Sequence, residues 1–147
     1  MNFWRESVLV TCLLSWFIAQ LLKVIFTVIK SKKIDFRRFI GSGGMPSSHS
    51  SFVTSLATAV GIEKGFVGSE FAMATVFALV VMYDAAGVRR AAGQQAKILN
   101  KIVEEWEQAD FEKTDKRLKE LLGHTPKEVF AGAVLGIVIA ILRHFPF

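Results

Sequence analysis

Three short polar segments carry residue types that could do acid–base or nucleophilic chemistry, and the first is GlySerGlyGlyMetProSerSerHisSer at positions 41–50. Its glycines permit positive φ angles, and Pro46 suits the first turn of a helix, where a missing N–H costs nothing. The amides and hydroxyls of Ser47 and Ser48 could then hold phosphate oxygens at the helix start, with His49 beside them as acid or base. A plain capped helix with a histidine in its first turn is an equally good interpretation.

The second segment is GlyHisThrProLysGlu at positions 123–128. Thr125, Pro126 and Glu128 form a capping box with proline at the first helical position, so we expect a helix to begin there. His124 stands directly before that helix. Glu128 has two candidate roles: it could accept a hydrogen bond from the Thr125 amide, or it could accept one from the His124 ring. The local sequence favours the capping role.

The third segment is TyrAspAlaAlaGlyValArgArgAlaAlaGlyGlnGln at positions 83–95, at the end of an apolar stretch. A carboxylate such as Asp84 is costly in hydrocarbon unless it is paired or near the interface, so we treat it as a functional candidate. Arg89 or Arg90 is its expected partner, and one of them is expected to face the two histidine segments across the same membrane surface. The alternative is that both arginines only set the membrane topology.

A polar stripe is also expected on the first apolar segment. Gln20, Lys23, Thr27 and Lys30 are spaced three, four and three residues apart, which places them on one face of a helix. Lys23 lies about two turns from the end of the segment and could reach water along its aliphatic stem. A lysine that only reaches water needs no other polar groups beside it, yet this face also carries an amide and a hydroxyl. We therefore interpret the stripe as one wall of a polar pocket.

A membrane is the expected surrounding of all these segments. The chain has 147 residues, of which 52% are hydrophobic, and its mean hydropathy is +0.40, which is too apolar for a typical soluble domain. Residues 7–29 and 66–88 are long enough to cross a hydrocarbon core of about 30 Å. Residues 50–62 and 128–142 are shorter and would cross if packed between neighbours, although a re-entrant path for 50–62 stays open.

The predicted fold is therefore an all-α integral membrane helical bundle with about four hydrophobic helices, in a single domain of residues 1–147. The segments at 29–50 and 88–128 are rich in lysine and arginine, and the opposite side offers only Arg5, Lys64 and Arg143. The positive-inside bias predicts a multi-pass protein of the cell membrane with both basic loops in the cytoplasm and both termini outside it. No nucleic-acid recognition motif accompanies the net charge of +5, so we expect no nucleic-acid partner.

A soluble helical insertion is expected at about 91–122. Ile98, Leu99, Ile102 and Trp106 recur at helical spacing and predict an amphipathic helix that could lie along the interface. A second, short helix is expected from about residue 114 to the glycine at 123. The single cysteine excludes an intrachain disulfide and a cysteine metal cage.

Three strings in this order carry a family resemblance: GlyGlyMetProSerSerHisSer, TyrAspAlaAlaGlyValArgArg and LeuGlyHisThrProLysGluVal. Over nearly its whole length the chain resembles the divergent, bacterial and plant branch of the type 2 phosphatidic acid phosphatase and vanadium-dependent haloperoxidase superfamily. The resemblance implies a helical-bundle phosphatase that needs no metal or other cofactor. Its substrate would be a phosphomonoester or pyrophosphate lipid headgroup at the cytoplasmic leaflet, of the phosphatidylglycerol phosphate, phosphatidic acid or polyprenyl phosphate type.

The resemblance also implies roles for individual residues. His124 is similar in position to the nucleophile that becomes a phosphohistidine, Glu128 to the acid that orients it, and His49 to the general acid. Asp84 is a further candidate for the catalytic set, as a neighbour of the histidines. The phosphate would be held by serine hydroxyls and amides and by lysine and arginine side chains, for which the candidates are Ser47, Ser48, Lys23, Lys30, Arg37, Arg89 and Arg90.

Two functions from other classes stay open at this stage. One is a membrane protein that binds or transports a phospholipid headgroup without cleaving it. The other is a structural membrane protein that acts through the amphipathic helix and through Gly132 and Gly136, a GxxxG pair that could also make a homo-oligomer.

Overall fold

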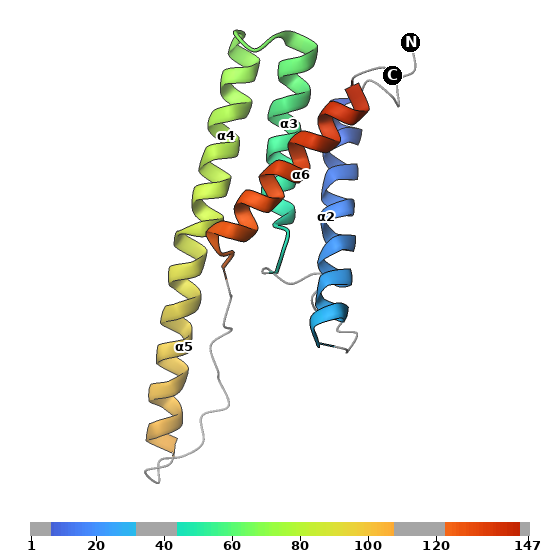
Figure 1. Ribbon diagram of the computed structural model, residues 1–147. Coiled ribbons are helices and arrows are strands. Elements are labelled where there is room, and N and C mark those ends of the chain that lie inside the picture. Colours follow the sequence, from blue (N-terminus) through green and yellow to red (C-terminus); the bar gives the residue numbers. More distant parts are fainter. Residues whose placement is uncertain (1–6, 32–43, 108–122, 145–147) are drawn as a thin grey trace.

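The structure is a computed structural model that describes residues 7–31, 44–107 and 123–144, and every described element is an α-helix. Figure 1 shows the helices arranged as a bundle with one long arm. The fold class predicted from the sequence is confirmed. The helices in chain order are α2 (Val8–Ser31), α3 (Ser48–Lys64), α4 (Ser69–Ala86), α5 (Val88–Glu107) and α6 (Pro126–His144).

The four hydrophobic helices run up and down between two ends of the bundle (Figure 1). At one end, which we call the site end, α3 and α6 begin and α4 finishes. At the other end, α2 begins, α6 finishes, and a short turn at 65–68 joins α3 to α4. The predicted segments at 7–29, 50–62, 66–88 and 128–142 thus correspond to α2, α3, α4 and α6, each shifted by a few residues.

Helix α3 is the centre of the bundle, because it packs against α2, α4 and α6. Small side chains make this possible, since serine, threonine and alanine let neighbouring backbones approach closely. Gly132 and Gly136 of α6 are buried against α3: a Cβ on Gly132 would overlap the Ser47 carbonyl, and one on Gly136 would overlap the Thr54 hydroxyl. The GxxxG contact predicted from the sequence is therefore made within the chain, and self-association remains a prediction.

Several buried hydroxyls in this apolar bundle are hydrogen-bonded between helices. Ser15 of α2 and Ser51 of α3 are both buried and their hydroxyls lie 2.6 Å apart. Thr54 of α3 donates to the Ser50 carbonyl in its own helix and lies 3.1 Å from the Ala133 carbonyl of α6. Because hydrocarbon offers no partner to a hydroxyl, these bonds favour one register of the helices over its alternatives.

Helix α5 follows α4 after the single residue Gly87 and continues in nearly the same direction (Figure 1). It has apolar residues at helical spacing, as predicted, with Ile98, Leu99 and Ile102 exposed along it. If α4 crosses the membrane, a helix that continues in the same direction points away from the membrane surface. This differs from the expectation that the helix could lie along the interface. The short helix expected at 114–123 falls mainly outside the described residues, and Gly123 itself is not helical.

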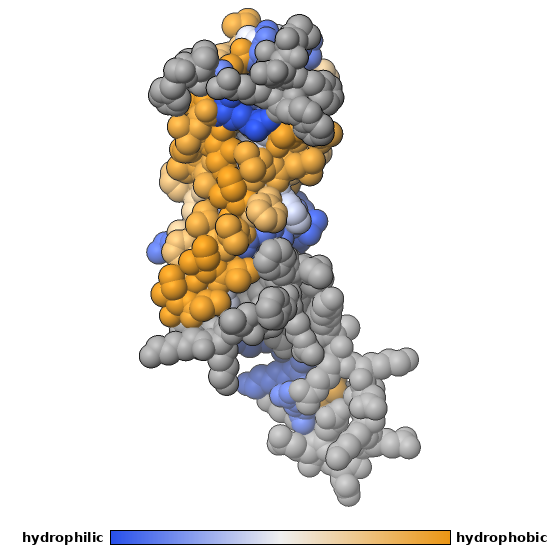
Figure 2. Space-filling view, turned by 90° about the vertical axis from the view of Figure 1, so that its right-hand side faces the viewer, coloured by the Kyte–Doolittle hydropathy of each residue, from blue (hydrophilic) through white to orange (hydrophobic). Residues whose placement is uncertain are grey.

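The outer surface of the bundle is apolar. Two helical stretches, Val8–Ile29 and Ser69–Glu104, are long and apolar enough to cross a membrane. Large apolar side chains on α4 such as Met73, Val76 and Val80 are mostly exposed. A patch of this kind is unfavourable in contact with water. In Figure 2, hydrophobic residues form a broad band on the described surface, whereas the described residues at the lower end are mainly hydrophilic. This distribution fits a bundle whose outer face contacts lipid.

The α3–α6 contact gives a first test. We expect Gly136→Leu to lower the stability of the protein by about 1–3 kcal/mol or more, because the added atoms meet the backbone of α3 at Ser51 and Ser55. Val134→Leu, on an exposed part of the same helix, is the control. The measurement is the midpoint of thermal unfolding in detergent, and equal midpoints for the two variants would contradict this packing.

Candidate functional site

Residues from all three polar segments line one small cavity at the site end. The cavity has a volume of about 20 Å³, which is room for about one water molecule. It lies where the first turn of α3, the end of α4, the start of α5 and the residues before α6 meet. Its lining residues are His49, Val81, Asp84, Ala85, Arg89, Gly123 and His124.

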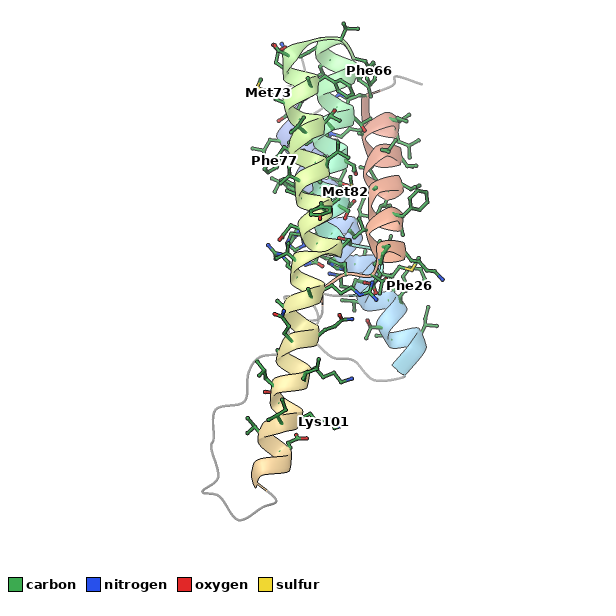
Figure 3. The ribbon with its side chains drawn as sticks, turned by 90° about the vertical axis from the view of Figure 1, so that its left-hand side faces the viewer. Phe26, Phe66, Met73, Phe77, Met82 and Lys101 are labelled. Atoms are coloured by element: carbon green, nitrogen blue, oxygen red, sulfur yellow. The ribbon has the colours of Figure 1, made fainter. Side chains whose placement is uncertain are left out.

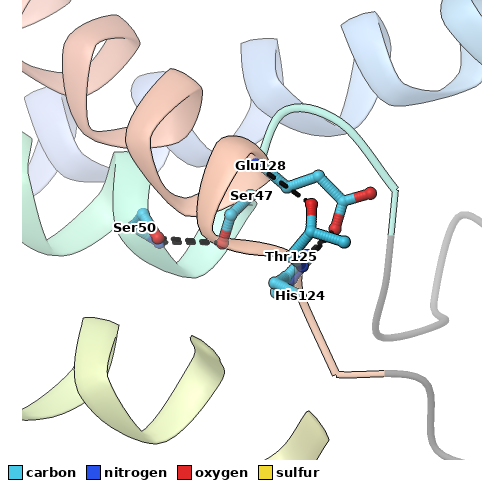
Figure 4. Close-up of polar contacts among 5 residues, drawn as sticks. All are labelled: Ser47, Ser50, His124, Thr125 and Glu128. Carbon is cyan, nitrogen blue, oxygen red and sulfur yellow. Dashed lines mark hydrogen bonds and ion pairs between the residues drawn. The ribbon is translucent and has the colours of Figure 1, made fainter. Parts of the chain in front are cut away.

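His124 is held from two sides before α6 begins. Its backbone N–H donates to the Ala85 carbonyl at the end of α4, with an N···O distance of 3.1 Å. Its ring Nδ1 lies 3.4 Å from Glu128 Oε2, as Figure 4 shows. The side chain is buried, and its Nε2 has no hydrogen-bond partner among the described residues. An Nδ1–H that donates to Glu128 would leave the lone pair of Nε2 free to react.

Glu128 performs both of the roles that the sequence left open. Its Oε2 accepts a hydrogen bond from the Thr125 amide at 2.9 Å while lying 3.4 Å from the His124 ring. The Glu128 amide lies 3.4 Å from the Thr125 hydroxyl, which completes the predicted capping box (Figure 4). Helix α6 begins at Pro126, as predicted. The same carboxylate oxygen therefore both starts the helix and orients the imidazole.

His49 lies in the first turn of α3 and faces His124. The two ring centroids are 6.2 Å apart, and the ring planes meet at 61°. His49 is exposed whereas His124 is buried, so the two imidazoles have different surroundings.

Asp84 and Arg89 form an ion pair next to the histidines. Arg89 Nε lies 2.6 Å from Asp84 Oδ2, and both side chains line the cavity. Of the two arginines considered from the sequence, Arg89 is therefore the partner of Asp84. Arg90 is exposed and is not among the cavity-lining residues. The pair holds the Arg89 guanidinium at the cavity, because the carboxylate fixes one edge of it.

Lys23 of α2 is buried, with 2% of its surface exposed, and its stem packs against Gly44, where a Cβ would be 3.2 Å from Lys23 Cγ. Gly44 has φ of +94°, a conformation that glycine adopts without strain. Gln20 on the same face is also buried, in agreement with the predicted polar stripe. The side chain of Lys30 and all of Arg37 lie outside the described residues, so their phosphate-binding roles remain predictions.

The serines before and at the start of α3 have structural partners. Ser47 is the N-cap: its hydroxyl accepts from the Ser50 amide at 3.3 Å and from the Ser50 hydroxyl at 3.0 Å (Figure 4). The Ser47 amide donates to the Glu128 carbonyl at 3.0 Å, and Ser48 is buried. Pro46 precedes the cap, so the expectation that proline occupies the first turn of this helix is wrong. The capped-helix interpretation of this segment is correct, while phosphate contacts by Ser47 and Ser48 stay untested.

Gly123 is a site residue that the sequence analysis did not recognise. The sequence predicts it as the stop of a short helix, which lies mainly outside the described residues. In the structure Gly123 lets the chain pass directly over the backbone of Arg89 and Arg90, where any Cβ would overlap. Ala85 was also missed, although its carbonyl holds the His124 amide. The glycine directly before His124 was a usable signal for a close approach, but no sequence pattern identifies a backbone carbonyl as a partner.

The surroundings of His124, which lies outside the membrane-crossing helices, favour its neutral form. Burial lowers the pKa of His124 below its ordinary value, and the positive charge of Lys23 lowers this pKa further. The hydrogen bond from the ring to Glu128 and the charge of that carboxylate oppose the shift. The net direction leaves His124 unprotonated at neutral pH, which is the form that can act as a nucleophile.

Together, the fold and the site define a class of helical membrane protein with a histidine-lined polar cavity at one end of the bundle. The chain belongs to the divergent PAP2 family, whose family model matches residues 4–139. It is 45% identical to the uncharacterized membrane protein YuiD of Bacillus subtilis (strain 168), a comparison that covers 88% of each chain. No solved structure matches the chain. The family resemblance and the membrane location predicted from the sequence are thus confirmed.

The pKa of His124 gives a second test, by NMR titration of histidine-labelled protein in micelles. We expect a midpoint below the ordinary value of about 6.5. Lys23→Met should raise it by removing a positive charge, and Glu128→Gln should lower it by removing a negative one. Lys97→Met, at an exposed position on α5, is the control.

The same shift has a consequence for stability. Because the folded state binds the proton less readily, the unfolded state takes it up first as the pH falls below about 6.5. The contribution of His124 to stability is therefore present above that pH and is lost as the pH falls toward the lowered pKa. A midpoint above about 6.5 in the folded protein would contradict the described surroundings of His124.

Proposed function

We propose that this protein is a lipid phosphate phosphatase that hydrolyses a phosphomonoester or pyrophosphate headgroup through a phosphohistidine. One observation carries the proposal: His49 and His124, from distant parts of the sequence, meet in one cavity beside Arg89. Membership of the divergent PAP2 family supports it. The proposal assigns the chemistry to two imidazoles and their neighbours rather than to a metal.

In the first step, Nε2 of His124 attacks phosphorus and the bond between phosphorus and the ester oxygen breaks. His49 donates a proton to the leaving oxygen, so that an alcohol departs rather than an alkoxide. Glu128 supports the attack because it accepts the Nδ1–H and stabilises the positive charge that forms on the His124 ring. The product of this step is a phosphohistidine and a free lipid alcohol, or a lipid monophosphate where the substrate is a pyrophosphate.

In the second step, water attacks the phosphohistidine. His49, now neutral, accepts a proton from that water, the bond between phosphorus and Nε2 breaks, and inorganic phosphate leaves. His124 returns to its neutral form and His49 to its protonated form. His49 therefore gives up one proton in the first step and takes one back in the second, His124 gains and loses the phosphoryl group, and both rings are unchanged after the cycle.

Cations on two sides of the histidines would balance the charge of the phosphoryl oxygens. Arg89 is held at the cavity by Asp84, and the charge of Lys23 reaches both His49 and His124. Stabilising charge that develops on the equatorial oxygens is the main requirement of phosphoryl transfer. Lys30, Arg37 and Arg90 remain candidates for further contacts to the headgroup.

A bound phosphoryl group needs more room than the cavity offers. Attack requires a nitrogen-to-phosphorus distance of about 3–3.5 Å, and the leaving oxygen adds a further hydrogen bond of about 2.8 Å to the acid. The present cavity of about 20 Å³ is too small for this. We propose that His49 moves outward when substrate binds, which its exposed position allows, whereas His124 stays fixed by Ala85 and Glu128.

The substrate is proposed to be a lipid because the site lies at the end of an apolar bundle. The basic residues of α5 directly beyond it, Arg89, Arg90, Lys97 and Lys101, favour a cytoplasmic site by the positive-inside rule. Phosphatidic acid, phosphatidylglycerol phosphate and polyprenyl phosphates all present a phosphate at that depth. A protein that binds such a headgroup without cleaving it is the second candidate, because Arg89 and Lys23 would attract a phosphate whether or not it is cleaved.

The proposed function is tested by phosphate release from these three lipids in mixed micelles. We expect His124→Gln and His49→Gln each to lower the rate at least about 100-fold, the usual minimum for loss of an acid or base. His144→Gln is the matched control, because His144 lies at the other end of the bundle beside Thr11 and Glu63. Failure of the purified protein to release phosphate from any of the three lipids would refute the proposal.

Rapid acid-free quenching with ³²P-labelled substrate separates catalysis from binding. We expect an acid-labile label on the wild-type protein and no label on His124→Gln. The label should accumulate in His49→Gln if this substitution slows hydrolysis of the phosphohistidine more than its formation. Lipid binding without any label in wild-type protein would favour the second candidate.

A further inference from the structure

A long apolar groove runs along the bundle from near the histidine cavity toward the opposite end. It lies between α3, α4 and α6 and has a volume of about 540 Å³. Its walls are mainly apolar, and three threonines also line it: Thr54, Thr58 and Thr75. The Thr54 hydroxyl is bonded to backbone carbonyls, whereas the Thr75 hydroxyl has no hydrogen-bond partner among the described residues. Its rim includes Leu79, Ile137 and Ile141, which are exposed on the lipid-facing surface.

The groove and the histidine cavity share one face of α4. Val81 and Ala85 line the cavity, while Ala78 and Met82 line the groove, and residues three and four apart lie on the same side of a helix. In Figure 3, Met82 and Phe66 lie on the side of α4 toward α6, whereas Met73 lies on the other side. A chain attached to a phosphate in the cavity would therefore meet the groove directly.

Two aromatic rings lie at the far end of the groove. Phe66 and Phe71 pack edge to face, with centroids 5.1 Å apart, and both line the groove. Phe66 also rests on Gly61 of α3, where a Cβ would overlap its ring. These contacts hold the two rings in place at that end of the groove.

We propose that this groove binds one hydrocarbon chain of the lipid whose phosphate lies between the histidines, and that the Phe66–Phe71 pair limits the length of chain it contacts. The inference rests on the proposed function for the identity of the headgroup site. From Ala85, which lines the cavity, to Phe71 in the groove, α4 extends about 21 Å at about 1.5 Å per residue. An extended chain with single bonds of about 1.5 Å advances about 1.3 Å per carbon, so a chain that starts at the cavity and ends at Phe71 has about 16 carbons.

The choice of this occupant follows from position and chemistry. The groove faces hydrocarbon, so a lipid chain is the molecule available to fill it, and a chain tethered to a bound phosphate has the advantage of an anchored end over the bulk lipid. Lipid tails are as apolar as the groove walls, so the gain is in orientation of the headgroup rather than in hydrophobic transfer. A chain lying in the groove would present the phosphate to His124 in one fixed direction.

Photo-labelling in phosphatidylcholine vesicles tests the proposal without relying on catalysis. The probe is hexadecylphosphonate, which is not hydrolysed, with a diazirine at about the tenth carbon. We expect at least five-fold more label on groove residues such as Thr58, Thr75 and Ile137 than on Met73 and Phe77 of the other α4 face. Unlabelled hexadecylphosphonate and the variant Arg89→Gln should each reduce the groove label at least five-fold.

A matched pair of variants controls for general lipid contact. Leu79 and Val76 are 57% and 60% exposed on α4, but only Leu79 lines the groove. We expect Leu79→Trp to reduce the groove label strongly and Val76→Trp to leave it unchanged. Equal labelling of both faces of α4, insensitive to the competitor and to Arg89→Gln, would overturn the proposal.

Chain-length competition tests whether the Phe66–Phe71 pair limits the length of the bound chain. Phosphonates of 8, 12, 16 and 20 carbons should compete with rising potency up to about 16 carbons and no further, and Phe71→Ala should extend the rise to 20. Potency that is independent of length would also overturn the proposal. Saturable groove labelling by a protein that releases no phosphate from any lipid would instead refute the proposed function and leave the groove assignment intact.

Discussion

The close approach of α6 to α3 is the constraint on which the site depends. Gly132 and Gly136 remove the side chains that would hold the two helices apart, and the Ser47 amide then reaches the Glu128 carbonyl. The first turns of both helices are thereby fixed beside each other, and each carries or adjoins one histidine. The second anchor is the bond from the His124 amide to the Ala85 carbonyl, which brings the end of α4 to the same place. Without these contacts the two imidazoles would share a membrane surface but not a cavity.

The hydrogen bonds made by polar groups inside the bundle follow from its apolar surroundings. Because lipid offers no hydrogen bonds, serine and threonine hydroxyls on α2 and α3 bond to each other and to backbone carbonyls. Lys23 is a buried cation whose stem lies on Gly44 and whose charge acts on His124 and Glu128. A cation placed this way is expensive for stability and useful for an anionic substrate, which is why we connect it with the phosphate.

Much of the fold could be predicted from the sequence because the signals were local. Apolar length predicted α2 and α4, the capping box predicted the start of α6 at Pro126, and apolar periodicity predicted α5. The candidate site could be predicted only as a set of segments that share a membrane surface. Pro46 lies before the helix, contrary to the prediction, and the close approach of Gly123 to α5 was not predicted. In both cases the deciding partner comes from a distant part of the chain.

By itself, the sequence determined the all-helical membrane character, the helix starts and the residue types available for phosphate chemistry, since these depend on composition and on neighbours within a turn or two. Only the tertiary structure decided that Arg89 rather than Arg90 pairs with Asp84, that Glu128 caps α6 and orients His124 with one oxygen, and that Ser47 is occupied as a cap. The physical reason is that hydrogen bonds and ion pairs act over about 3 Å. Which groups come within that distance depends on how the helices pack, and no local pattern encodes it.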